Sequence, residues 1–106
     1  METIKSNSEF EKVFSRGRRY SSDLLRIRVA RTDEGDHGRV AFVAPKRLGN
    51  AVYRNRCKRV LREAARSCGL PLGSFDVILL STDRTHDSSP EQVAVSLRGL
   101  LRRAGV

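Results

Sequence analysis

The feature that most constrains the fold is an apolar stripe with helical spacing inside the most basic part of the chain. At about 100° per residue, six side chains fall within about a third of the helix circumference. They are Tyr53, Cys57, Val60, Leu61, Ala64 and Cys68. A helix over about residues 51–68 must bury this stripe against other elements. Asn50 can cap its start, and Gly69 follows as its stop.

The same helix carries a dense row of positive charge. Residues 46–66 hold eight basic side chains against one acid, Glu63. Arg54, Lys58, Arg62 and Arg66 are spaced four apart, so they form one row beside the apolar stripe. Like charges at this spacing weaken an isolated helix by a few tenths of a kcal/mol per pair. A sequence that accepts this cost indicates a surface for a polyanion, and arginine suits bidentate phosphate contacts.

The composition of the whole chain agrees with a small basic domain. Its 106 residues predict a single domain over 1–106, and 21 basic against 12 acidic side chains give a net charge of +9. Such a charge favours nucleic acid first and an anionic membrane surface second. There is no apolar run of the roughly 18–20 residues that a membrane span needs. The N-terminus has no signal-peptide pattern. We therefore expect a cytoplasmic protein without a membrane partner.

The remaining patterns predict an α+β domain. A first helix is expected with Ser8 as its cap and Glu11 as the capping-box partner, ending at Gly17. A last helix is expected from Ser89, with Pro90 and Gln92 completing its start. Cys57 and Cys68 lie roughly 16 Å apart along one helix, beyond disulfide reach, so both are expected as buried thiols.

Strands are predicted from alternating and continuous apolar runs. Residues 24–30 alternate and residues 39–44 return after a polar turn, which favours a hairpin. Residues 18–22 form a basic connector or a short edge strand. The run 75–80 is apolar and β-branched, which predicts a buried central strand in a sheet covered on one face by helices.

The block of residues 49–64 resembles the signature of the bacterial ribonuclease P protein subunit, with its Arg–Asn–Arg motif at residues 54–56. Phe10, the pair Val13–Phe14 and Gly17 are similar to the first helix of that family. The resemblance implies an α/β sandwich with a four-stranded sheet and a left-handed βαβ crossover through the basic helix. It also implies an accessory to a catalytic RNA that removes the 5′ leader from precursor tRNA, with Mg²⁺ used by the ribonucleoprotein and no metal site in the protein.

The resemblance and the charge pattern together assign the RNA-binding residues. The resemblance implies contacts to the ribozyme RNA for Arg54, Asn55, Arg56, Lys58, Arg59 and Arg62. The surrounding basic segment adds Lys46, Arg47, Asn50 and Arg66. For Asn50 two interpretations stay open, since it can cap the helix alone or also help to hold a phosphate or a hydrated metal ion.

A second site is implied between the first helix and the sheet, where the family holds the leader of its substrate. Phe10 and Phe14 would line this cleft, where aromatic rings can stack on single-stranded bases. Their alternative role is core packing of an amphipathic helix. Arg28 stands where an aromatic residue is common in the family, and it could pair with a leader phosphate instead.

The sequence predicts no catalytic group in the protein itself. Asp33, Glu34 and Asp36 cluster in a polar turn beside His37, and His86 adjoins Asp87 without a placed nucleophile. There is no glycine-rich phosphate loop and no zinc spacing. A structural RNA-binding protein, such as a small ribosomal protein, is the alternative function. A DNA reader is disfavoured because a continuous basic row leaves no uncharged base-reading residues.

Overall fold

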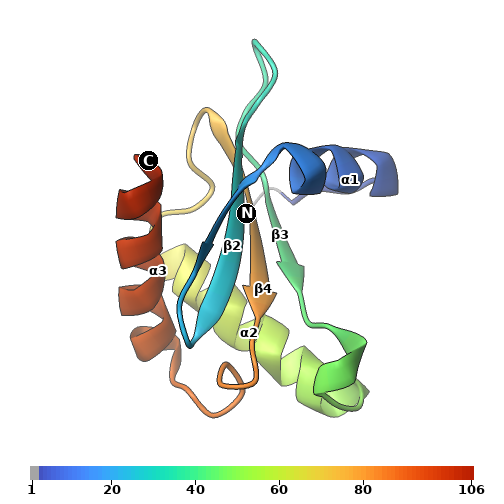
Figure 1. The fold of residues 1–106 in the computed structure, drawn as a ribbon, viewed down its shortest axis with the longest axis vertical. Helices are drawn as coiled ribbons and strands as arrows, with labels where there is room; N and C mark the ends of the chain where they lie inside the picture. Colours follow the sequence, from blue (N-terminus) through green and yellow to red (C-terminus); the bar gives the residue numbers. More distant parts are fainter. Residues whose placement is uncertain (1–2) are drawn as a thin grey trace.

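A computed structural model describes residues 3–106 of the chain and has seven regular elements with one short 3₁₀ helix. The elements are α1 (Asn7–Arg16), β1 (Arg18–Ser21), β2 (Leu25–Arg31), β3 (Val40–Val43), η1 (Lys46–Leu48), α2 (Ala51–Ser67), β4 (Phe75–Ser81) and α3 (Pro90–Ala104). The predicted order is confirmed, including the short basic strand β1. This is the α+β domain with a four-stranded sheet that the sequence indicated (Figure 1).

The strands lie in the order β1-β2-β4-β3, antiparallel except for the parallel pair β3–β4. Helix α2 connects β3 to β4, so these three elements form a βαβ crossover. Its left-handed sense stays a prediction from the family resemblance. The hairpin predicted between residues 24–30 and 39–44 is wrong, because β4 lies between these strands and pairs with both.

The central position of β4 follows from its apolar character on both faces. Val77, Ile78 and Leu79 are completely buried, whereas β2 alternates buried and more exposed residues. Alternation identifies the faces of a strand but not its neighbours. The β2–β3 connection crosses the start of β4, where the Gly38 N–H donates to the Gly73 carbonyl at 2.7 Å. A Cβ at Gly38 would lie only 2.0 Å from the Leu72 carbonyl oxygen, so this crossing requires glycine.

The sheet is covered by helices on both faces, which corrects the prediction of one covered face. Helices α2 and α3 pack on one face over the main core, which includes Ile27, Leu61, Leu79 and Leu97. Helix α1 packs on the opposite face through a smaller cluster around Val13, as its separate position in Figure 1 shows. One face is thus fully covered and the other only partly, which leaves sheet surface beside α1.

The helix ends agree with the sequence in all but one case. At α3, Ser89 and Gln92 form the predicted capping box, with Pro90 between them at the first helical position. At α1, the cap is Ser6 and not Ser8, and its hydroxyl accepts from the Glu9 N–H at 3.2 Å. The sequence offers serine at both positions, and the helix begins two residues earlier than predicted, at Asn7. Gly17 ends α1 as predicted.

The two cysteines are free thiols on the side of the sheet that α2 and α3 cover. Cys57 is completely buried, and the Cys68 thiol, half-buried, donates to the Ala94 carbonyl at 3.4 Å. Burial raises the pKa of both thiols, so it disfavours the reactive thiolate. No helix within residues 3–106 is long and apolar enough to cross a membrane.

Candidate nucleic-acid interface

The basic segment begins with a tightly built entry into α2. The Asn50 side chain accepts from the Tyr53 N–H at 2.9 Å, so the predicted cap is confirmed. Gly49 has a φ of 155°, and a Cβ there would press on the Tyr53 ring at 3.1 Å. Lys46 and Arg47 lie in η1, directly before this turn. The cap fixes the direction of α2 and therefore the direction of its charged row.

The row of four basic residues follows the β3 edge of the sheet. At its start, Arg54 Nε donates to the Ala44 carbonyl at 3.0 Å, just beyond the end of β3. Two turns later, the Arg62 guanidinium lies 5.2 Å from the centre of the Phe42 ring on β3. Lys58 and Arg66 belong to the same row by their spacing, so the positive charge runs along one side of the sheet.

The other side of α2 is joined to the loop between β4 and α3. The Tyr53 ring stacks on His86 with 4.0 Å between centroids and 3° between planes. Arg56 Nε donates to the His86 carbonyl at 3.2 Å, and His86 Nδ1 lies 2.8 Å from Asp87 Oδ1. The apolar spacing predicted Tyr53 in the buried stripe, and the sequence showed His86 only beside Asp87 in a loop without a placed nucleophile. The apolar spacing of α2 carried no signal for this stack, because it depends on a distant loop.

Most of the predicted RNA-binding side chains are not neutralised by protein groups. In this set the only ion pair within residues 3–106 joins Arg47 to Asp83 at 3.0 Å, and both groups are exposed. Among the described residues, the side chains of six members of this set form no hydrogen bond. They are Lys46, Asn55, Lys58, Arg59, Arg62 and Arg66. The charges of the five basic members and the amide group of Asn55 are therefore available to a partner.

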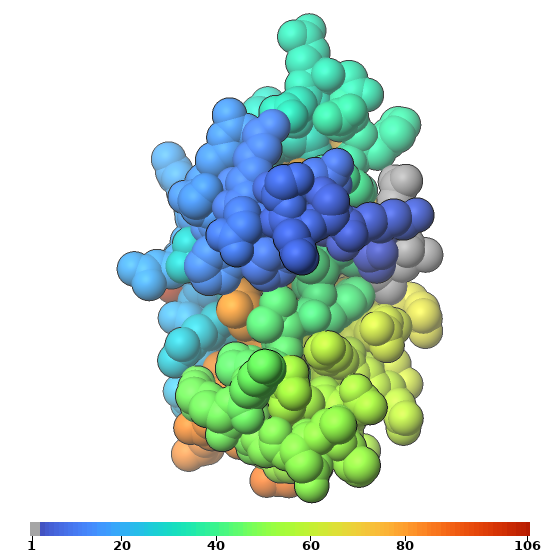
Figure 2. All heavy atoms as spheres, turned by 90° about the vertical axis from the view of Figure 1, so that its right-hand side faces the viewer, coloured from blue at the N-terminus to red at the C-terminus, as the bar shows by residue number. Residues whose placement is uncertain are grey.

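The three residues predicted for the leader cleft lie together on one side of α1. The Phe10 and Phe14 rings stack with 5.8 Å between centroids, and the Arg28 guanidinium covers Phe14 at 4.0 Å. Both rings are half-buried against Val13 and Ile78, so each has a packing role and an accessible part. In Figure 2, atoms of β3 and β4 reach the surface between α1 and the start of α2.

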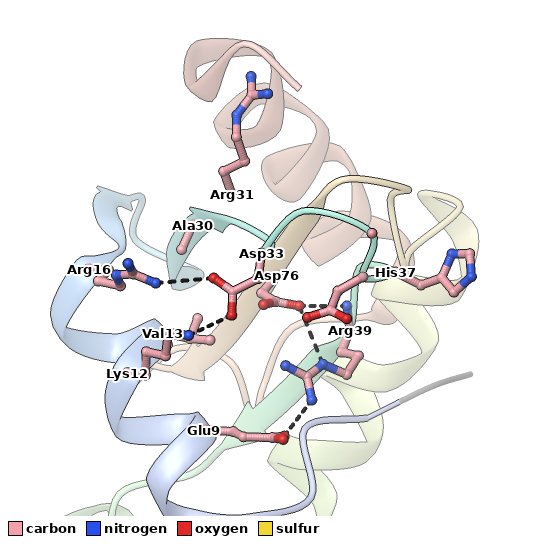
Figure 3. A pocket seen from close by; sticks show the side chains of 12 residues that line it. Glu9, Lys12, Val13, Arg16, Ala30, Arg31, Asp33, His37, Arg39 and Asp76 are labelled. Carbon is pink, nitrogen blue, oxygen red and sulfur yellow. Dashed lines mark hydrogen bonds and ion pairs between the residues drawn. The ribbon is translucent and has the colours of Figure 1, made fainter.

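The opposite side of α1 holds a polar cavity of about 380 Å³ that sequence analysis did not predict (Figure 3). Lys12 Nζ and Arg16 Nη1 approach the Asp33 carboxylate at 2.6 and 3.5 Å. The hydrogen bond and charge of Lys12 lower the pKa of Asp33. The sequence showed Asp33 only as part of a polar turn, since nothing local indicates that α1 reaches it.

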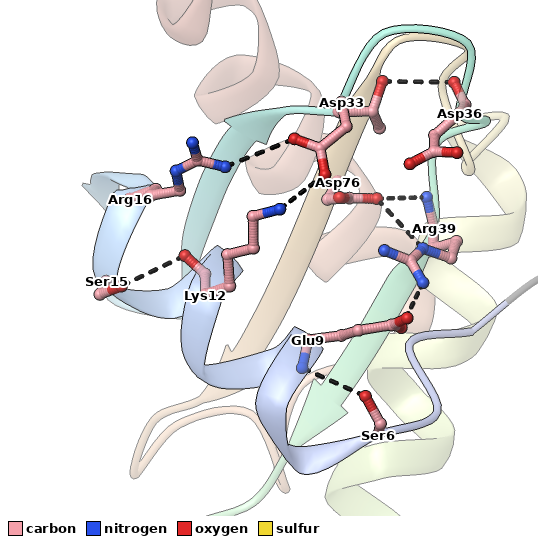
Figure 4. A network of polar contacts seen from close by, with 10 residues as sticks. Ser6, Glu9, Lys12, Ser15, Arg16, Asp33, Asp36, Arg39 and Asp76 are labelled. Atoms are coloured by element: carbon pink, nitrogen blue, oxygen red, sulfur yellow. Dashed lines mark hydrogen bonds and ion pairs between the residues drawn. The ribbon is translucent and has the colours of Figure 1, made fainter.

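Arg39 is the centre of a second set of contacts in the same network (Figure 4). It pairs with Glu9 on α1, and its Nε lies 3.7 Å from Oδ1 of Asp76 on β4. Asp76 is 4% exposed and also accepts from the Arg39 N–H at 2.9 Å. Burial acts to lower the pKa of Arg39, but Glu9 and Asp76 outweigh it and raise that pKa. These pairs fasten α1 and the β2–β3 connection to the sheet.

Within the described residues, no three His, Cys, Asp or Glu side chains lie where they could hold a metal ion. What the geometry offers is a cationic surface along α2 and an accessible sheet face beside α1. A small α+β protein with such an unneutralised helix surface belongs to the class of polyanion-binding domains.

Comparison with known proteins identifies the family within that class. A family model described as Ribonuclease P matches residues 1–105, and the chain belongs to this family. The ribonuclease P protein component of Gluconacetobacter diazotrophicus is 40% identical over 105 residues, which cover 97% of this chain and 90% of the relative. The ribonuclease P protein component of Clostridium novyi is 33% identical and covers 99% and 95%.

A solved structure gives the same result for the fold. The RNase P protein of Staphylococcus aureus superimposes with a TM-score of 0.81 at 28% identity, covering 98% of this chain and 95% of that one. The RNase P protein of Thermotoga maritima superimposes with a TM-score of 0.79 over 97% of both chains. At 22% identity, this similarity supports the fold and nothing further. The family resemblance found in the sequence is thereby confirmed.

Proposed function

We propose that this chain is the protein subunit of ribonuclease P, an endoribonuclease that removes the 5′ leader from precursor tRNA. In this proposal the catalyst is the partner RNA with its Mg²⁺ ions, and the protein contributes binding and orientation. The family membership supports the assignment to ribonuclease P. We expect the protein to act in the cytoplasm, on RNA and not on DNA.

The observation that carries the proposal is the unneutralised basic row of α2. Its residues are held in one direction by the Asn50 cap and by the Arg54 and Arg56 contacts to backbone carbonyls. Its side chains without protein partners are available for the phosphates of the ribozyme RNA. The helix fixes the spacing of these side chains, and the planar guanidinium loses little conformational entropy for each hydrogen bond that it forms, which favours a structured RNA partner.

The second part of the proposal concerns the substrate. We expect the leader of precursor tRNA to lie on the sheet face beside α1, against Phe10, Phe14 and Arg28. The two surfaces are built from different elements, α2 for one and α1 with the sheet for the other. One protein could therefore hold both RNAs at once and reduce the repulsion between them.

The experiment is cleavage of a precursor tRNA by a bacterial ribonuclease P RNA at low Mg²⁺, with and without this protein. Each component is also incubated alone with the substrate. We expect the RNA alone to be nearly inactive, because few ions then screen the two polyanions, and the mixture to cleave at the correct 5′ position.

Two results would contradict the proposal. RNA binding without stimulation across several ribozyme RNAs would indicate a structural RNA-binding protein. Cleavage by the protein alone would show that the catalyst is not the RNA. Varying Mg²⁺ in the same reaction tests the ion requirement of the ribonucleoprotein.

A further inference from the structure

The β1–β2 hairpin brings three arginines together on the face that carries α1. Arg19 is directly opposite Arg28 in the β1–β2 register, and Arg26 is opposite Ser21. Residues directly opposite on antiparallel strands point to the same face, and like charges in such pairs are destabilising. Within residues 3–106 none of the three arginines forms an ion pair. The sheet therefore presents concentrated positive charge that is not paired with a carboxylate among the described residues.

This cationic patch continues directly into an apolar patch of the same face. The register across the sheet gives two adjacent rows. One row contains Arg19, Arg28, Ile78 and Ala41, and the next contains Ser21, Arg26, Leu80 and Val43. Ala41, Val43 and Leu80 are only partly buried. The arginines thus occupy the β1–β2 half of the surface and the apolar side chains occupy the β4–β3 half.

The central arginine is held in position by α1. Arg28 Nη1 donates to the Phe14 carbonyl at 2.7 Å, in the last turn of the helix, where a cation is favourable. Its guanidinium covers one face of the Phe14 ring at 4.0 Å, and Phe10 packs beside that ring. Partial burial and then the charge of Arg19 lower the pKa of Arg28. Phe14 therefore has a ring face occupied by protein, which leaves less of it for stacking on a base.

The remaining donors of Arg28 reach the surface. The bond to Phe14 is the only hydrogen bond of its side chain within the described part of the chain. No buried side-chain nitrogen there lacks a partner, so the unused N–H groups are accessible. A guanidinium with one anchored and several open donors suits a phosphate oxygen.

We propose that Arg19, Arg26 and Arg28 are the phosphate-binding half of the leader site, and that the protein holds the leader by its backbone charge. This inference rests on the proposed function. The leader strand runs along the hairpin with its phosphates over the arginines and its bases over Ala41, Val43 and Leu80. Because these small apolar side chains offer no hydrogen-bonding groups, the site does not select bases.

The occupant that fits both halves is single-stranded RNA. A duplex keeps its bases paired and stacked inside, so it would leave the apolar half uncovered. Inorganic phosphate would use the arginines alone. A flexible single strand has a charged side and an unpaired base side, and these match the two halves of the surface.

The test uses the complex of this protein with a bacterial ribonuclease P RNA and three precursor tRNAs with leaders of equal length. One leader is natural, one has abasic sugars, and one has neutral methylphosphonate linkages. Dissociation constants are measured for the wild type and for Arg19→Gln and Arg26→Gln, two exposed positions without a side-chain hydrogen bond among residues 3–106. Arg18→Gln is the matched control, because Arg18 is also exposed but faces the other side of the sheet.

We expect the methylphosphonate leader to bind roughly 10-fold more weakly than the natural leader and the abasic leader to stay within about 3-fold of it. Arg19→Gln should weaken binding of the precursor with the natural leader by roughly 3- to 10-fold. It should not further weaken binding of the precursor with the methylphosphonate leader. Arg18→Gln should match the wild type. The proposal is overturned if base removal costs more than charge removal, or if Arg18→Gln and Arg19→Gln lose the same affinity.

The same preparations separate this inference from the proposed function. If the protein stimulates cleavage but the leader chemistry has no effect, only the arginine site is wrong. If the protein does not stimulate cleavage, the proposed function fails, and the arginines are then scored by single-stranded RNA binding to the free protein. In that binding experiment, the slope of log K against log salt should be smaller by about 0.7 for Arg19→Gln than for Arg18→Gln. Equal slopes would overturn the site.

Discussion

Two regions of this molecule use positive charge in different ways. On one side of α1, Lys12, Arg16 and Arg39 each face a carboxylate of another element. Across η1 and α2, eight basic residues from 46 to 66 have one acid in their own segment and one ion pair, from Arg47 to Asp83. The first region pairs its positive charges with carboxylates, and the second leaves most of its positive charges unpaired.

The difference separates two roles that composition cannot distinguish. Paired charges hold elements together, as Arg39 does for α1, the β2–β3 connection and β4. Unpaired charges in a fixed row raise the electrostatic energy of the free protein, and a polyanion relieves it on binding. Variants of the first region should therefore change stability with little effect on RNA affinity, and variants of the second should do the opposite.

The largest effect on stability is expected for Asp76→Ala. The Asp76 carboxylate is buried and accepts from the Arg39 N–H, so its loss leaves a backbone donor unpaired and removes a charge partner. We expect the free energy of unfolding to fall by about 2–4 kcal/mol in urea titrations. The RNA affinity of the protein that remains folded should not change.

Asp76→Asn is the matched control, because its amide oxygen can still accept from the Arg39 N–H. Its cost should be clearly smaller than that of Asp76→Ala. Equal losses in the two variants would mean that the charge, and not the backbone hydrogen bond, carries the contribution.

A smaller effect is expected for Asn50→Ala, at the border between the two roles. Loss of the cap to the Tyr53 N–H should cost about 1 kcal/mol of unfolding free energy. Asn50→Asp keeps a capping oxygen and should retain that stability. If ribozyme RNA passes close to the start of α2, Asn50→Asp should nevertheless bind RNA more weakly. Unchanged RNA affinity of Asn50→Asp would restrict this residue to capping.

The smallest effect is expected for Asp33→Asn, and it depends on pH. Because Lys12 lowers the pKa of Asp33 in the folded state, the carboxylate contributes stability above the ordinary Asp pKa near 3.8. This contribution is lost as pH falls through the lowered pKa. Asp33→Asn should therefore be slightly less stable than the wild type at neutral pH, and the two should converge in acid. A constant difference between their pH–stability curves would contradict the pairing.

The sequence predicted what local spacing determines. The stripe of α2, the Asn50 cap, the capping box at Ser89 and the buried run of β4 are short-range patterns, and each is confirmed. The predicted cap of α1, Ser8, was wrong, because Ser6 and Ser8 have the same side chain. Only the backbone conformation decides which of the two caps the helix.

Contacts between distant segments could not be predicted in the same way. The insertion of β4 between β2 and β3 depends on strand partners, which an alternating pattern does not encode. The Tyr53–His86 stack and the Arg19–Arg28 pair likewise require the register of elements far apart or across a turn. The roles of the basic residues in RNA binding stay predictions until they are measured.

The most direct test of the two roles is the salt dependence of ribozyme RNA binding by Arg59→Gln/Arg62→Gln/Arg66→Gln. These three exposed side chains make no hydrogen bond within residues 3–106, so the unfolding free energy should stay close to that of the wild type. The slope of log K against log salt should fall by roughly 2, with a Lys12→Gln/Arg16→Gln control changing it much less. A folded triple variant with the wild-type slope would contradict the claim that the open charges of α2 bind RNA.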